Sequence, residues 1–175
     1  GKILFDQITL LGKILNVFKF KNQIISIDNK FYIKVDCINL QIVSPYFLKG
    51  VGEEVHTSAK KICDMLDHFK KKPEIIIDIG SCWGETSLYF AKRYVGSTVF
   101  SIEGSIDNFV VQSRNKTKQD FKTDNLYIDN LAISDKNGFV YITNGIGTMN
   151  QVQNYDPTVS NLVKVKAQTL TRFFQ

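Results

Sequence analysis

The chain has 175 residues, of which 43% are hydrophobic and 22% are charged, and its formal net charge is +5. This length fits one domain with a core of its own, and the composition is that of an ordinary soluble globular chain, without repeats or low-complexity tracts. No apolar run is long enough to span a membrane, and Asp6 and Lys13 interrupt the apolar N-terminus where a signal peptide needs its core, so we expect a cytoplasmic protein.

The first elements form an N-terminal extension, which we place at residues 1–56. Residues 2–20 have helical character. Residues 23–27 and 31–35 alternate around an Asp-Asn turn, which is typical of a β-hairpin, and a further short strand is expected over residues 38–43. A helix and a β-hairpin are therefore expected ahead of the main domain.

An amphipathic helix is predicted over residues 57–72, before Pro73. Its apolar residues follow helical spacing: Ala59, Ile62, Cys63, Leu66 and Phe69. His68, near the last turn, is interpreted as an exposed histidine rather than a catalytic base. The three lysines at residues 70–72 are interpreted as a solvated helix end that meets the helix dipole favourably, rather than as a nucleic-acid patch.

The most informative motif is an apolar, β-branched run at residues 75–79 that contains Asp78 and leads into Gly80 and Gly84. The run predicts a strand buried on both faces, and residues 86–92 predict a helix. The two glycines permit a tight turn and let a ligand approach the backbone, and the helix N-terminus beyond them makes such a turn a nucleotide pocket. The spacing D-x-G-x-x-x-G differs from the G-x-G-x-x-G of dinucleotide enzymes and favours S-adenosylmethionine over NAD.

A second acid, Glu103, ends the next predicted strand at residues 99–103. In a βαβ nucleotide fold, an acid about 20 residues beyond the glycine turn binds the ribose hydroxyls, because a carboxylate accepts hydrogen bonds from both of them. Parallel strands end at the same edge of a sheet, so Asp78 and Glu103 are expected to lie side by side where such sheets bind ligands.

The remaining chain predicts one more helix and three more strands. Ser105 is a plausible N-cap for the helix, and residues 125–133 follow it as the third strand and its exit. A turn at residues 134–138 fits a hairpin connection to a strand at residues 139–142. Residues 162–167 alternate and form a further strand.

A metal site is not indicated. Cys37, Cys63 and Cys82 are far apart, and they form no C-x-x-C motif and no Cys/His cluster, so neither a disulfide framework nor a zinc site is expected. Cys82 lies inside the glycine turn, where contact with a ligand and simple packing both stay open.

From residue 75 onward the chain resembles the FkbM-type methyltransferases. The matching pieces occur in the family's order, at residues 76–84, 101–105 with Asn108, 130–135 and 163–170. The resemblance implies an α/β fold, namely a Rossmann-like class I methyltransferase sheet with helices on both faces. It also implies S-adenosylmethionine as methyl donor and an oxygen of a sugar, glycan or other small molecule as the usual acceptor.

Residue by residue, the resemblance implies a cofactor site along the two strand ends. Asp78, Gly80 and Ser81 would line the methionine and ribose end of the cofactor, beside Gly84 of the same turn. Glu103 would hold the ribose hydroxyls.

The resemblance also implies an adenine site beyond the second strand. Gly104 and Ser105 would border the adenine, and Asn130 and Ala132, at the exit of the third strand, would flank the ring.

Two departures from the family pattern matter. Ser81 and Cys82 replace the small residue and asparagine that are usual in the turn, which weakens the side-chain hydrogen bonding expected there. The chain stops at Gln175, before the family's acidic strand motif, so residues 57–175 are expected to form a partial methyltransferase domain that is incomplete at its C-terminal side. The strand at residues 75–79 would then lack one neighbour, and we expect self-association through that exposed edge.

The catalytic base is not assigned, although His56, Asp129 and Asn150 are candidates. Two other functions stay open: an RNA methyltransferase, suggested by the positive net charge, and a non-catalytic, incomplete module that keeps the fold without turnover. The basic residues are scattered along the chain, which does not favour a nucleic-acid partner.

Overall fold

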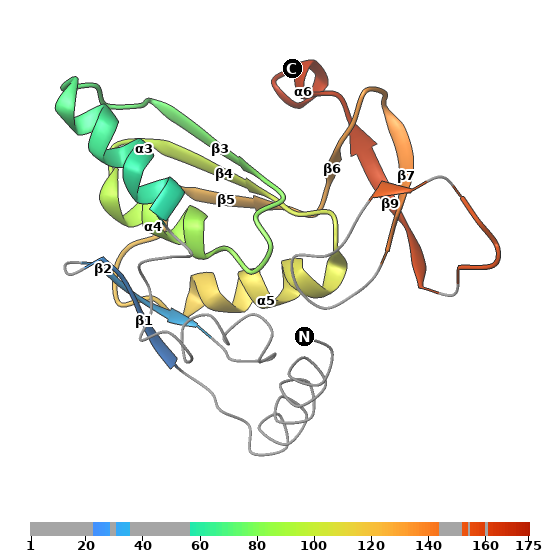
Figure 1. Cartoon of the computed structure of the whole chain (residues 1–175), viewed down its shortest axis with the longest axis horizontal. Coiled ribbons are helices and arrows are strands. Elements are labelled where there is room, and N and C mark those ends of the chain that lie inside the picture. Colours follow the sequence, from blue (N-terminus) through green and yellow to red (C-terminus); the bar gives the residue numbers. More distant parts are fainter. Residues whose placement is uncertain (1–22, 29–30, 36–56, 144–151, 154, 160) are drawn as a thin grey trace.

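The structure is a computed structural model that describes residues 23–28, 31–35, 57–143, 152–153, 155–159 and 161–175 (Figure 1). The described part is a mixed α/β structure with a three-stranded parallel sheet, a four-stranded second sheet and a two-stranded hairpin. The second sheet lies beyond the carboxyl ends of the parallel strands (Figure 1). Several predictions fall outside the described residues: the helix at 2–20, the strand at 38–43, and the side chains of Cys37, His56 and Asn150.

The predicted N-terminal hairpin is confirmed. Strands β1 (Gln23–Asp28) and β2 (Phe31–Val35) pair in the antiparallel direction, with an irregularity near the end of β1. Strand β2 contacts helix α4 (Glu85–Arg93), so the hairpin lies against the main part of the chain.

The parallel sheet contains β3 (Ile75–Ile79), β4 (Thr98–Ile102) and β5 (Leu126–Asp129), in the order β3-β4-β5. Helix α4 connects β3 to β4, and helix α5 (Ile106–Thr117) connects β4 to β5. The three strands run in register, so their carboxyl ends lie at one edge. The turn after β3 and the residues after β4 are therefore neighbours, as the sequence predicts.

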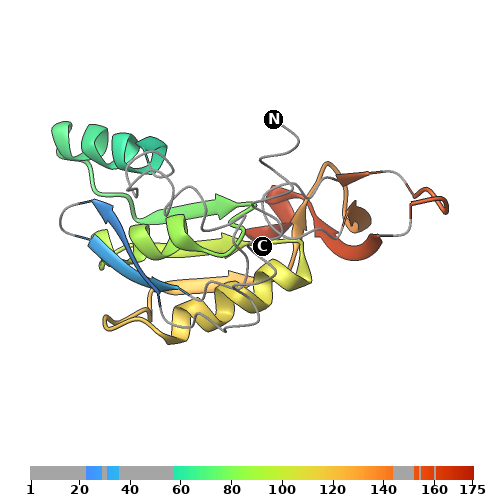
Figure 2. The ribbon, with the colours of Figure 1, turned by 60° about the horizontal axis from the view of Figure 1, so that its bottom comes forward.

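One face of the parallel sheet carries the main core. Helices α4 and α5 lie on the same side of the sheet (Figure 2), and helix α3 (Thr57–His68) adds Ala59 and Cys63 to the same core. The buried side chains of this core are Ala59, Cys63, Cys82, Trp83, Leu88, Tyr89, Phe90, Ala91, Tyr94, Val99, Val111 and Leu126. This packing fixes the position of the turn after β3, because Cys82 and Trp83 of that turn belong to the core.

The opposite face of the parallel sheet is less covered. Among the described residues, the short helix α6 (Leu170–Phe173) contacts it, with the rings of Phe100 and Phe173 centred 5.4 Å apart. Tyr127, which pairs with Phe100 and shares its face, is 52% exposed. Within the described part, helices therefore cover one face of the sheet as predicted, whereas on the other face only the short α6 makes contact.

The strand order of the second sheet differs from the predicted hairpin. Its strands are β6 (Ala132–Ile133), β7 (Gly138–Thr143), β8 (Val152–Gln153) and β9 (Leu162–Gln168), in the order β6-β9-β7-β8. The turn before β7 exists, but β9 lies between β6 and β7, so the predicted hairpin across residues 134–138 is wrong. The alternating residues of β9 bury one apolar face together with residues of both neighbours, in a core of Ala132, Val140, Ile142, Val165 and Ala167.

The third strand and its exit, predicted over residues 125–133, form two strands that belong to two different sheets. Strand β5 ends at Asp129, and β6 begins at Ala132. The backbone N–H of Leu131 donates to the carbonyl of Glu103 over 3.2 Å, and the Asn130 amide donates to the same carbonyl over 2.8 Å. These bonds turn the chain at residues 130–131 and redirect it into the second sheet.

Helix α3 ends four residues earlier than predicted. Lys70 adopts a left-handed φ of 52°, its N–H donates to the Asp67 carbonyl, and the N–H of Lys71 donates to the Leu66 carbonyl over 2.8 Å. This is a Schellman ending, which normally uses glycine. His68 is exposed as predicted, but Phe69, predicted to face the core, is 64% exposed.

Ile62 of the same helix is also expected to face the core, and it is 48% exposed.

Strand β3 is likewise more exposed than the sequence predicts. Its end residues Ile75 and Ile79 are 54% and 52% exposed, and the three residues between them are half-buried. Among the described strands, β3 pairs with β4 alone, so it forms an edge rather than the fully buried strand that was predicted.

Candidate functional site

The turn between β3 and α4 is held open by its backbone. Gly80, Cys82 and Gly84 have positive φ angles of 75°, 52° and 87°. The N–H groups of Gly80 and Ser81 both donate to the carbonyl of Ile102, over 2.8 and 3.2 Å, which ties the turn to the end of β4. A Cβ added to Gly80 would meet no atom within 4 Å, and Gly80 is exposed. A ligand can therefore approach the backbone at Gly80, as the sequence predicts.

Glu103 organises the site from the end of β4. Its Oε2 accepts a hydrogen bond from the backbone N–H of Cys82 over 2.7 Å, and its Oε1 accepts one from the N–H of Ser105 over 2.7 Å. The residue is 7% exposed, and burial raises the pKa of its carboxyl although these donors oppose the shift. Glu103 lies at the glycine turn as predicted, but its carboxylate already has three protein donors there, because the Asn108 side chain also donates to it. A carboxylate has about four lone pairs, so one of them remains for a ligand.

Asp78 lies inside a chain of buried hydroxyl groups. Its Oδ2 accepts a hydrogen bond from the Ser87 hydroxyl over 2.6 Å, and the Ser87 and Ser101 oxygens lie 2.5 Å apart. Burial raises the pKa of Asp78, and the Ser87 hydrogen bond opposes that shift. Ser87 and Ser101 are fully buried, and the sequence analysis did not identify either of them. The signal for Ser101 is a hydroxyl inside an otherwise apolar strand.

Gln112 of α5 joins the turn to these hydroxyls, and the sequence analysis also missed it. Its Nε2 donates to the Ser81 hydroxyl over 3.0 Å and to the Ser101 hydroxyl. A Cβ added to Gly84 would lie 2.6 Å from the Gln112 Cγ, so glycine at this position is required by the packing of α5. Gln112 is 1% exposed.

Glu85, the first residue of α4, adds a third carboxyl to the turn. Its Oε2 is buried and has no hydrogen-bond partner among the described residues. Burial raises the pKa of Glu85 to about 8, and the negative charge of Asp78 adds to the shift. Burial also raises the pKa of the Cys82 thiol to about 12, so this thiol is not a nucleophile at neutral pH. The sequence signal for Glu85 was an acid directly after Gly84.

The predicted adenine-side residues lie together next to Glu103. The Asn130 amide donates to the carbonyls of Glu103 and Gly104, over 2.8 and 3.0 Å, and so fixes the backbone between β4 and α5. Ser105 caps α5 by accepting the N–H of Asn108, as predicted. The side chain of Ala132 is 8% exposed and belongs to the second core. Contact of these residues with an adenine stays a prediction.

Of the three candidates for a catalytic base, only Asp129 lies within the described residues. Asp129 is exposed at the end of β5, and its carbonyl accepts the N–H of Glu103 over 3.0 Å. His56 and Asn150 lie outside the described residues. Over the described ranges, His, Cys, Asp and Glu side chains form no group that could hold a metal ion.

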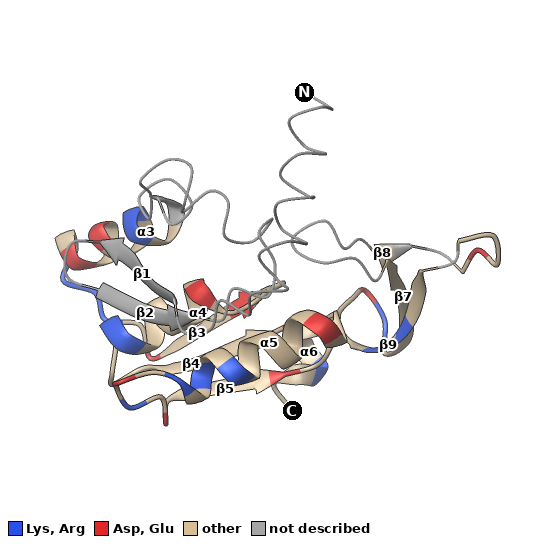
Figure 3. Ribbon diagram, turned by 90° about the horizontal axis from the view of Figure 1, so that it is seen from below, with Lys and Arg blue, Asp and Glu red and all other residues tan. Residues whose placement is uncertain are grey.

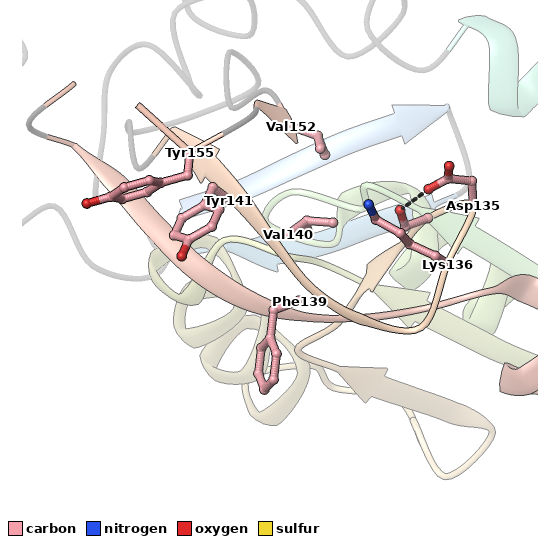
Figure 4. Close-up of a pocket in the computed structure, with 8 residues that line it drawn as sticks. Asp135, Lys136, Phe139, Val140, Tyr141, Val152 and Tyr155 are labelled. Atoms are coloured by element: carbon pink, nitrogen blue, oxygen red, sulfur yellow. Dashed lines mark hydrogen bonds between the residues drawn. The ribbon is translucent and has the colours of Figure 1, made fainter. Parts of the chain in front are cut away.

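A separate cavity of about 460 Å³ lies beside β7 in the second sheet. Asp135 and Lys136 lie at one end of it, and Tyr141 and Tyr155 lie at the other (Figure 4). The two tyrosine rings are centred 4.9 Å apart. None of the residues predicted to bind the cofactor lines this cavity.

Comparisons with models of protein families, with curated proteins and with solved structures give no match to this chain. The resemblance to the FkbM-type methyltransferases therefore stays a prediction from the sequence. Within the described residues, every helix is too short or too polar to cross a bilayer.

Proposed function

We propose that the turn between β3 and α4 binds S-adenosylmethionine, and that the chain belongs to a methyltransferase acting on an oxygen of a sugar, glycan or other small molecule. The observation that carries this proposal is the set of three carboxyl groups around the turn. Asp78, Glu85 and Glu103 surround a glycine turn at the N-terminus of a helix. The turn is open to a ligand at Gly80.

The carboxyl groups select the kind of nucleotide. A helix N-terminus usually favours phosphate, because its free N–H groups and dipole attract anions. Here Glu103 already accepts the N–H groups of Cys82 and Ser105, and the carboxylate of Asp78 would repel a pyrophosphate, while Glu85, whose pKa is raised to about 8, stays largely protonated at neutral pH. A ligand with hydroxyl groups and positive charge fits this surrounding better. S-adenosylmethionine carries ribose hydroxyls, an ammonium group and a sulfonium, and no phosphate.

Each residue then has a distinct role. The carboxylate of Asp78 would accept hydrogen bonds from the amino-acid and ribose end of the ligand, while the backbone at Gly80 makes room for it. Glu103 would accept a ribose hydroxyl with its remaining lone pair, and the second hydroxyl would have to compete with one of the protein donors. Asn130 would hold the loop that borders the adenine. The bound cofactor would supply an electrophilic methyl group, and the protein would contribute mainly by holding donor and acceptor in line.

Calorimetric titration with S-adenosylhomocysteine tests the proposal directly. We expect saturable binding to the wild-type chain and its loss in Asp78→Ala and Glu103→Ala. Asp124→Asn removes an exposed acid ahead of β5, at the end of that strand away from the site, and should bind as the wild type does. NAD and AMP, which carry phosphate, should bind more weakly. A folded wild-type chain that binds NAD but not S-adenosylhomocysteine would overturn the proposal.

The RNA methyltransferase alternative receives no specific support from the described surface. Figure 3 shows the Lys and Arg positions of the described ribbon spread over several elements, with Asp and Glu positions among them. RNA binding driven by phosphate contacts would weaken steeply with salt, so a salt series in a gel-shift assay separates this alternative. The non-catalytic alternative is separated by methyl transfer itself, since binding without turnover on any acceptor would favour it.

A further inference from the structure

Gln112 bridges two parts of the candidate ligand site from helix α5. One N–H of its amide reaches the Ser81 hydroxyl in the glycine turn, and the other reaches the Ser101 hydroxyl in β4. Its Cγ packs where a side chain on Gly84 would have to lie. Any movement of this side chain would therefore disturb both the turn and the hydroxyl groups beneath it.

The hydrogen bonds beyond Gln112 run in one direction. An amide nitrogen can only donate, so Ser101 accepts from Gln112 and uses its own hydrogen elsewhere. Ser87 gives its hydrogen to Asp78, so the short contact between Ser87 and Ser101 requires Ser101 to be the donor. The order is Gln112 to Ser101 to Ser87 to Asp78. If the amide were flipped, its oxygen would accept the Ser101 hydrogen. The Ser87 and Ser101 oxygens would then face each other with no hydrogen between them.

The chain of donors ends on a carboxylate in a buried setting. Successive hydrogen bonds of one direction polarise each other, which strengthens the last of them. We propose that Gln112 is a positioning residue of the ligand site: through Ser101 and Ser87 it holds the Asp78 carboxylate as an oriented acceptor, and through Ser81 it fixes the glycine turn. The role in ligand binding rests on the proposed function, whereas the effect on Asp78 does not.

The surroundings of Asp78 make this effect measurable. Burial raises the pKa of Asp78, and the Ser87 hydrogen bond lowers it. No charged group of α5 is among the causes of this shift. The titratable groups beside Asp78 are Glu85 of α4, Glu103 after β4 and Cys82 of the turn, whose own pKa values the negative charge of Asp78 raises. All three are acids, so loss of the donor chain would be uncompensated and the pKa of Asp78 would rise.

The test follows the Asp78 carboxyl by carbon NMR during a pH titration of the ligand-free protein. Gln112→Met keeps the length of the side chain and removes the donor, and Ser101→Ala interrupts the chain with a much smaller change. Both variants should shift the Asp78 midpoint upward by about 0.5–1 pH unit. Asn115→Leu is the matched control, because Asn115 is equally buried on α5 and donates to the Trp83 carbonyl over 3.0 Å without joining the donor chain.

The outcomes separate the two proposals. An unchanged Asp78 midpoint in folded Gln112→Met and Ser101→Ala, or an equal shift in Asn115→Leu, would overturn the positioning role. A shifted midpoint in a protein that does not bind S-adenosylhomocysteine would uphold the donor chain and remove the proposed function. If both stand, binding of S-adenosylhomocysteine should fall more steeply below neutral pH in the two variants than in the wild type.

Discussion

The carboxylate of Glu103 accepts the backbone N–H of Cys82, 21 residues earlier in the chain, over 2.7 Å. This one bond joins the turn after β3 to the end of β4. The same carboxylate accepts the N–H of Ser105, so it also fixes the start of α5. Glu103 is therefore both a structural element of the turn and the proposed partner of a ligand.

Replacing Glu103 with glutamine should destabilise the fold. The amide has one acceptor oxygen, so the N–H of either Cys82 or Ser105 would face an NH₂ group. A buried donor without an acceptor costs roughly 1–3 kcal/mol, and we expect a loss of that size in the free energy of unfolding by urea. Asp129→Asn is the control and should change stability by less than about 0.5 kcal/mol. A Glu103→Gln protein as stable as the wild type would show that the two hydrogen bonds contribute little.

The two glycines of the turn should respond differently to alanine. At Gly84, the new Cβ would meet Gln112 at 2.6 Å and the φ is 87°, so Gly84→Ala should cost roughly 2–4 kcal/mol of stability. At Gly80, the space is open, and only the left-handed backbone opposes a Cβ, at about 1–2 kcal/mol.

Ligand binding sharpens this comparison. The Cβ of Gly80→Ala would project into the space through which a ligand reaches the backbone, so this milder variant should lose binding of S-adenosylhomocysteine while it stays folded. Thermal unfolding and calorimetric titration of both variants provide the measurement. Full ligand affinity in Gly80→Ala would place the ligand elsewhere.

Glu85 should make the protein less stable as the pH rises. Its pKa is about 8 in the folded chain, against an ordinary value of 4.5. The folded state thus holds a proton that the unfolded chain releases, and stability falls between about pH 4.5 and 8 by up to about 1.4 kcal/mol per pH unit from this group.

Glu85→Gln removes that contribution. The variant should match the wild type near pH 5 and exceed it at pH 8 by on the order of 2–4 kcal/mol, measured by urea unfolding at both values. Some decline with pH should persist in the variant, because burial also raises the pKa of Asp78 and of Glu103. A variant less stable than the wild type at pH 8 would mean that Glu85 is stabilised as an anion in solution.

The exposed edge of the parallel sheet should drive self-association. Ile75 and Ile79 are more than half exposed on β3, which pairs on one side only among the described strands. An apolar open edge invites pairing with another chain, so we expect the mass from light scattering to rise with concentration. Ile75→Lys should suppress the rise, while Val95→Lys, at a 73% exposed position outside the sheet, should not. A concentration-independent monomer would contradict the expectation.

The parts of the fold that the sequence predicts are those with local signals. Helix α5 begins where Ser105 caps it, and β4 ends where an apolar run meets Glu103. The end of α3 has no such signal, because a lysine occupies the left-handed position that glycine normally marks. The place of β9 between β6 and β7 depends on pairing between distant segments, with Ala132 opposite Ala167. Such pairing leaves no trace in either segment alone.

The residues of the candidate site also divide into those with a local signal in the sequence and those without one. Asp78 and Glu103 stand out because each interrupts or ends an apolar strand. Ser87 and Gln112 resemble ordinary polar residues of helices, and their importance arises only when α5 packs against the turn. Glu85 resembles an acid that favours a helix N-terminus, and only burial of its carboxyl reveals the shifted pKa.

The strand order of the second sheet has a consequence for the time course of folding. The three described strands of the parallel sheet are all present once Asp129 has been synthesised, and each of their pairings joins segments that are near in the chain. Strands β6 and β7 must wait for β9, which is made later and then fits between them. Until then both keep open edges, and this interval is when a growing chain is most exposed to aggregation and to chaperones. Pulse-labelling hydrogen exchange should accordingly show the amides of β4 protected before those of β7.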